Sequence, residues 1–147
     1  MAAQIPVEFQ HLVRYEPTYR VLICFPCKMA VGKRAWSRHV RCHHTISKSE
    51  RKSLMTALDT LSIIESDDHF PHPADLQEPI RGLAIQNAHK CTSCDFITRS
   101  DETIRRHIRK SHAEANLLLC PGSNTHWQEV KVQQWTATGK GAKYWIV

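Results

Sequence analysis

The strongest constraint in this sequence is a repeated set of cysteines and histidines. Two Cys-x-x-Cys pairs, Cys24/Cys27 and Cys91/Cys94, are each followed by two histidines, after gaps of 11 and 12 residues. A tetrahedral Zn²⁺ site takes four such ligands, and a tight cysteine turn facing two histidines near a helix end supplies them. The 147 residues are therefore expected to fold around metal sites, as one domain or as two small ones.

The second cluster has the spacing C-x2-C-x12-H-x4-H, formed by Cys91, Cys94, His107 and His112. Ser100 can cap a helix that carries acidic residues in its first turn and basic residues in its last turns, the order that a helix dipole favours. Phe96, Ile104 and Ile108 are placed to pack beneath the metal. This pattern predicts a zinc site in a ββα-like finger.

The first cluster is formed by Cys24, Cys27, His39 and either His43 or His44. Its apolar positions repeat those of the second cluster, which indicates a shared fold. The shorter gap predicts a tighter turn into the helix. His43 lies on the same helix face as His39, whereas His44 reproduces the second cluster's histidine spacing but requires the helix end to loosen. Both remain candidates for the fourth ligand.

The chain is predicted to be a small zinc-stabilised α+β protein with two ββα-like C2H2 fingers, a bridging helix and loop, and a C-terminal β-hairpin. Ser47 and Glu50 form a capping box for the bridging helix, and Leu54, Leu58 and Leu61 are expected to cover the first finger. The predicted segments are an N-terminal segment (1–18), the first finger (19–46), the helix and loop (47–90), the second finger (91–112) and a β-rich segment (113–147).

The remaining cysteines, Cys42 and Cys120, are expected to be buried free thiols. Six cysteines in 147 residues are too few for a disulfide scaffold. No secretory signal is expected at the N-terminus, and no run approaches the roughly 20 apolar residues of a membrane span. These features predict an intracellular, reducing location without membrane contact.

The net charge of +6 is concentrated around the two clusters. Residues 1–44 carry seven basic and two acidic residues, whereas residues 45–90 carry five and seven. Basic charge on a compact element favours a polyanionic partner, so DNA or RNA binding through phosphates in the nucleus is the first functional hypothesis. In the usual finger geometry Arg34, Arg38 and Arg106 would face the bases, too few for strong sequence specificity.

A second hypothesis is a zinc-stapled protein-interaction module that does not bind DNA. Three of the four tryptophans lie in the last 21 residues, and an aromatic cluster of this kind can form a binding platform or pack internally. Catalysis is not expected, because four protein ligands leave no open position on either zinc ion.

With these residues in view, the chain resembles the OrsD-like family of fungal proteins with paired C2H2-type zinc fingers. The resemblance covers roughly residues 19–147, including the segment Glu78–Leu83 before the second finger and the run Val130–Trp135 after it. It implies a zinc-binding domain, usually near the N-terminus of a larger fungal protein, with the ligand roles falling on the two clusters. It implies no particular activity.

Overall fold

The computed structural model describes residues 4–113 and 126–147, which form two compact units. The first unit contains the chain up to Pro73, together with Pro79–Ala84 and Gln134–Lys143. The second contains Ala74–Glu78, the described residues of Ile85–Gln133, and Tyr144–Val147. Neither unit is one continuous stretch of sequence. The apolar run before Cys120, and Cys120 itself, lie outside the described residues. The prediction that Cys42 is buried is wrong: its side chain is exposed, because it falls on the solvent-facing side of its helix.

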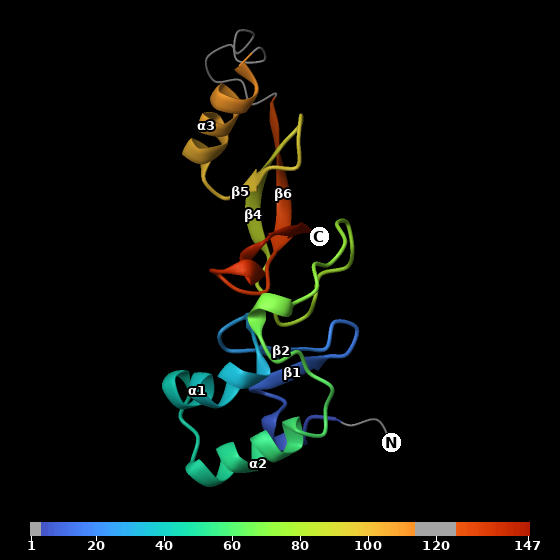
Figure 1. The fold of residues 1–147 in the computed structure, drawn as a ribbon, viewed down its shortest axis with the longest axis vertical. Helices are drawn as coiled ribbons and strands as arrows, with labels where there is room; N and C mark the ends of the chain where they lie inside the picture. Colours follow the sequence, from blue (N-terminus) through green and yellow to red (C-terminus); the bar gives the residue numbers. More distant parts are fainter. Residues whose placement is uncertain (1–3, 114–125) are drawn as a thin grey trace. The chain divides into compact units, whose positions relative to one another are not determined.

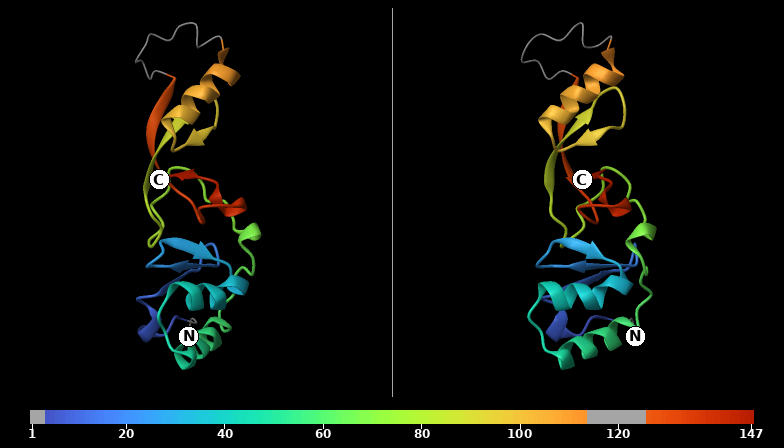
Figure 2. Two further views of the ribbon diagram at one scale, coloured as in Figure 1. Left: turned by 90° about the vertical axis from the view of Figure 1, so that its left-hand side faces the viewer. Right: turned by 60° about the vertical axis from the view of Figure 1, so that its left-hand side comes forward.

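The first unit is built on an antiparallel sheet in the order β1-β2-β3 (Figure 1). The strands are β1 (Val13–Glu16), β2 (Val21–Cys24) and β3 (Met29–Val31). Helices α1 (Lys33–His43) and α2 (Lys48–Leu58) follow, and both lie on the same side of this sheet (Figure 2). The order β2-β3-α1 is the predicted ββα finger, and β1 extends its sheet from the N-terminal segment.

The core of the first unit joins the finger to the bridging helix. Trp36 and Val40 of α1 and Leu54 and Leu58 of α2 are fully buried in one apolar cluster, with Leu61 beside them. The predicted capping box is present: the Ser47 hydroxyl accepts from the Glu50 N–H, and the Glu50 carboxylate accepts from the Ser47 N–H. The prediction that this helix covers the first finger is therefore confirmed.

The second unit is an antiparallel sheet in the order β5-β4-β6-β7 with one helix packed against it. Its elements are β4 (Gln86–Cys91), β5 (Ile97–Thr98), α3 (Asp101–Ser111), β6 (Trp127–Gln133) and β7 (Trp145–Ile146). Ser100 caps α3 as predicted, since its hydroxyl accepts from the Thr103 N–H. The α+β class and the paired C-terminal strands β6 and β7 are confirmed.

The strand β6 has a second partner that the sequence did not predict. Residues 127–132 of β6 pair with the whole of β4, so that Trp127 lies opposite Cys91. The C-terminal segment therefore extends the sheet of the second finger. Trp135 lies beyond the end of β6 and belongs to the first unit, where its carbonyl accepts from the Ala30 N–H and its indole donates to the Pro71 carbonyl.

The described residues also form short 3₁₀ helices: η1 (Val7–Phe9), η2 (Asp67–His69) and η3 (Lys140–Ala142). Between η2 and β4 the chain forms turns and irregular structure, as the prolines there predict. Within residues 4–113 and 126–147, no helix has the length and apolar character needed to cross a membrane.

Candidate metal centres

The first candidate metal centre lies between the β2-β3 turn and the C-terminal end of α1. It brings together one possible ligand atom from each of Cys24, Cys27, His39 and His44, all within 4.8 Å of one another. The Nε2 atom of His44 is 3.2 Å from Cys24 Sγ, 3.7 Å from Cys27 Sγ and 3.3 Å from His39 Nε2.

These separations match the edges of a metal-centred tetrahedron. Zinc bonds of about 2.3 Å to sulfur and about 2.0–2.1 Å to nitrogen place tetrahedral ligand atoms about 3.3–3.8 Å apart. Two thiols and two imidazoles are also the donor set that zinc prefers. The three separations from His44 therefore fit a four-coordinate metal ion.

The end of α1 determines which of the paired histidines joins this group. The helix ends at His43, and His44 is its C-cap residue with an extended backbone (φ −133°, ψ 150°). This change of direction carries the His44 ring to the cysteines. The ring of His43 lies outside the group, with its centroid 4.8 Å from that of His39. The loosened helix end that a His44 ligand requires is thus present in the structure.

The second candidate metal centre has the same construction. Cys91, Cys94, His107 and His112 lie together, again with all ligand atoms within 4.8 Å. Cys94 Sγ is 3.2 Å from His107 Nε2, and His112 is the C-cap residue of α3, as His44 is of α1. The Nε2 atom of His112 is buried and has no hydrogen-bond partner among the described residues. A metal ion would satisfy that nitrogen.

The gap between the second cysteine and the first histidine is one residue shorter in the first cluster. The missing residue falls in the link between strand and helix. In the first finger Gly32 alone separates β3 from α1, whereas Arg99 and Ser100 separate β5 from α3. From these links onward, the ligand histidines occupy equivalent positions in the two helices. An aromatic ring supports the first histidine in each case: Trp36 stacks on His39 at 5.6 Å between centroids, and Phe96 stacks on His107 at 4.1 Å.

Burial sets the protonation of the ligand groups before a metal binds. It lowers the pKa of His39 to about 4, with the nearby His43 and His44 adding to the effect. Burial also lowers the pKa of His44 and of His107. These imidazoles are therefore neutral at pH 7, the form that binds metal. Burial raises the pKa of Cys24 to about 12, so metal binding must displace a proton from this thiol.

Lys90 is a supporting residue that the spacing analysis did not identify. Its ammonium donates to the carbonyl oxygens of Cys91 and Cys94, at 3.2 and 3.3 Å. These two bonds tie together the ends of the cysteine turn and place a positive charge near two prospective thiolates. In the sequence, only the position of Lys90 next to Cys91 could have indicated this supporting role.

The two finger helices carry eight of the 20 lysines and arginines. Arg34, Arg38 and Arg106 are all exposed, as base- or phosphate-facing residues must be. Arg34 lies 3.8 Å from the Glu65 carboxylate. Arg105 also has partners, since it pairs with Asp101 at 2.8 Å and lies over the Trp127 ring.

The N-terminal end of α1 is covered by the loop that follows α2. The carbonyls of Ile64 and Glu65 accept from the N–H groups of Lys33 and Arg34, and Asp67 Oδ1 accepts from the Gly32 N–H at 2.6 Å. A Cβ atom at position 32 would lie only 2.6 Å from that oxygen, which requires glycine there. This acidic loop covers the helix end that a groove-reading finger would present to bases.

The tryptophans of the C-terminal segment do not form an exposed platform. Trp135 is 2% exposed in the first unit, and Trp127 and Trp145 are 6% and 0% exposed in the second. They serve internal packing, the other use that the sequence allowed.

Comparison with known proteins agrees with the resemblance seen in the sequence. Residues 11–113, which contain both candidate centres, match the OrsD family, described as "Orsellinic acid/F9775 biosynthesis cluster protein D". The chain belongs to this family. It is 30% identical over 139 residues to the Orsellinic acid/F9775 biosynthesis cluster protein D of Emericella nidulans, which covers 90% of this chain and 27% of that protein. The chain thus spans about a quarter of that relative's length. No solved structure matches it.

Proposed function

We propose that each Cys2His2 group holds one structural zinc ion and that the chain is a zinc-stabilised binding module. The donor set, the separations between ligand atoms and the unpartnered His112 nitrogen all support zinc. Four protein ligands fill each tetrahedron, so the ions stabilise the fold and take no part in catalysis.

The two neighbouring histidines of the first centre provide a test of this assignment. His44→Ala is expected to leave one zinc ion per chain, because it removes a ligand atom 3.2–3.7 Å from the others. His43→Ala is the matched control and is expected to keep both ions, because its ring lies outside the group. Elemental analysis of the purified variants measures the difference. Loss of zinc from the His43 variant alone would contradict the assignment.

We further propose that the module binds nucleic acid through phosphate contacts, within a nuclear protein. The observation that carries this proposal is the charge of α1, which contains Lys33, Arg34, Arg38 and Arg41 and no acidic residue. Arg38 and Arg41 are exposed and form no ion pair with another described residue. Cations on an ordered helix attract phosphates whatever the base sequence.

Sequence specificity is expected to be weak. The loop that covers the α1 N-terminus keeps that end away from base edges, and Glu102 in the first turn of α3 would repel phosphates. Arg38 and Arg41 are left to act as phosphate contacts on α1, and Arg106 on α3.

The salt dependence of binding to a short DNA duplex tests this proposal. Binding is expected at about 50 mM salt and to be lost by about 200 mM, because it rests on counterion release. The double variant Arg38→Ala/Arg41→Ala is expected to lower the slope of log K against log salt by about 2. Fluorescence anisotropy measures both quantities.

A matched double variant on the neighbouring helix is the control. Lys48→Ala/Lys52→Ala removes the same charge from exposed positions of α2 and should leave the slope nearly unchanged. Equal effects of the two double variants would show that net charge alone is responsible. Absence of duplex binding at low salt would overturn the nucleic-acid proposal and leave the protein-interaction module.

A further inference from the structure

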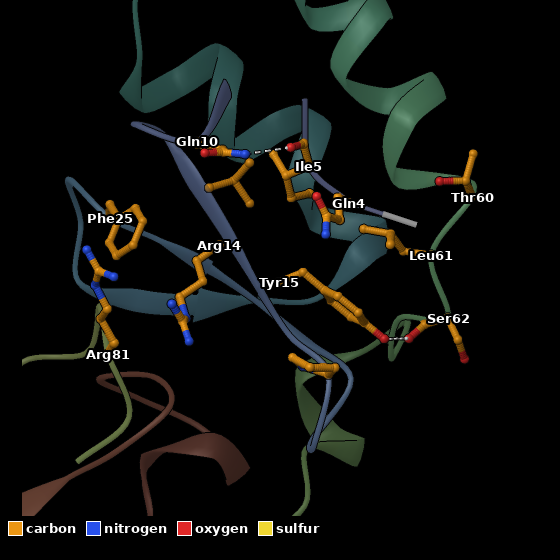
Figure 3. Close-up of a pocket in the computed structure, with 12 residues that line it drawn as sticks. Gln4, Ile5, Gln10, Arg14, Tyr15, Phe25, Thr60, Leu61, Ser62 and Arg81 are labelled. Atoms are coloured by element: carbon orange, nitrogen blue, oxygen red, sulfur yellow. Dashed lines mark hydrogen bonds between the residues drawn. The ribbon is translucent and has the colours of Figure 1, made fainter. Parts of the chain in front are cut away.

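A pocket of about 640 Å³ lies beside β1 in the first unit, and no metal-ligand residue lines it (Figure 3). Its volume is in the range of small-molecule sites. Val13, Arg14 and Tyr15 all line it, although successive residues of a strand point to opposite faces. The pocket therefore runs along the outer edge of β1, an edge strand of its sheet.

Arginines supply all the charge that lines this pocket. Arg14 and Arg81 line the pocket, and no acidic residue of the described chain lines it. Arg14 Nε is buried without a hydrogen-bond partner among the described residues, while its Nη2 lies 3.6 Å from the Glu16 carboxylate. That ion pair holds the side chain in place. A guanidinium group matches a carboxylate in shape and charge.

The rest of the lining combines four polar residues, Gln4, Gln10, Thr60 and Ser62, with aliphatic surface and two aromatic rings. Ile5 and Leu61 are 8% and 7% exposed and contribute aliphatic surface. The Tyr15 hydroxyl donates to the Ser62 carbonyl at 2.8 Å, which holds its ring in place. In Figure 3 both guanidinium groups lie on the side of the pocket with Phe25, and Tyr15 and Leu61 lie across from them.

We propose that this pocket binds a small organic acid with a flat apolar body. Its carboxylate accepts from Arg14 and Arg81, and its body lies against Tyr15, Leu61 and Ile5. Arg14 supplies one cation from a side chain that is 33% exposed, and Arg81 supplies the second, which is solvent-facing. The site is separate from the basic face of α1 and independent of the nucleic-acid proposal.

The test uses 2-naphthoate and its neutral analogue 2-naphthalenemethanol, titrated into the purified full chain and followed by amide chemical shifts. The acid is expected to bind about tenfold more tightly than the alcohol, with shifts centred on β1 and on Leu61 and Ser62. Arg81→Gln is expected to weaken the acid about tenfold and to change the alcohol's affinity little. Arg81 is exposed, so this variant should fold normally.

Arg99→Gln removes the same charge from an exposed position outside the pocket and should leave both affinities unchanged. A larger effect of Arg81→Gln than of Arg99→Gln on the acid alone supports the proposal. Equal effects of the two variants, equal affinity of acid and alcohol, or no saturable binding of the acid up to about 10 mM would overturn it.

Discussion

The Cys91→Ser variant is expected to bind one zinc ion per chain instead of two and to lose the fold of the second finger. Cys91 is fully buried, and its cluster includes Ile104, Ile108 and Trp127. Structural zinc contributes about 10–16 kcal/mol of apparent folding free energy in small fingers. The small apolar core of this finger cannot replace a contribution of that size.

Elemental analysis and the chemical-shift dispersion of the Ile104 and Ile108 methyl groups measure this result. Cys42→Ser is the matched control, because Cys42 is an exposed cysteine outside both ligand groups. It should keep two zinc ions and an unchanged spectrum. A Cys91 variant that retained two ions and its methyl dispersion would contradict the assignment of the second centre.

The Leu58→Ala variant is expected to lose about 2–5 kcal/mol of unfolding free energy while keeping both zinc ions. Leu58 is fully buried against Leu54, Trp36 and Val40, so truncation removes apolar contacts and leaves a cavity. It contributes no ligand atom, which separates core stability from metal binding. Chemical denaturation at saturating zinc measures the change.

Val7→Ala is the control for this second prediction, because Val7 belongs to the same unit and is 80% exposed. Its effect should lie within about 0.5 kcal/mol. A Leu58 variant as stable as the Val7 variant would show that α2 does not share a core with the first finger.

The parts of this protein that depend on local spacing could be predicted from the sequence. The two cysteine turns, the caps formed by Ser47 and Ser100, and the apolar positions under each metal centre follow from short-range rules. Each depends on residues within about two helical turns of one another. The choice between His43 and His44 could not be made, because it depends on where α1 ends.

The parts that depend on distant contacts could not be predicted. The pairing of β6 with β4 joins segments about forty residues apart. The acidic loop over the α1 N-terminus brings Asp67 to Gly32, and no repeated sequence pattern predicts this contact. Nor does a sequence reveal that Arg14 keeps a buried N–H without a partner, since this depends on the shape of the pocket. Such features arise from tertiary packing, which short-range patterns do not encode.

The number of zinc ions per folded chain tests the central claim most directly. Native mass spectrometry of the purified chain is expected to show one dominant species carrying two zinc ions. Acidification should release both ions as the ligand thiolates and imidazoles take up protons. A folded chain that carried one zinc ion or none would contradict the account.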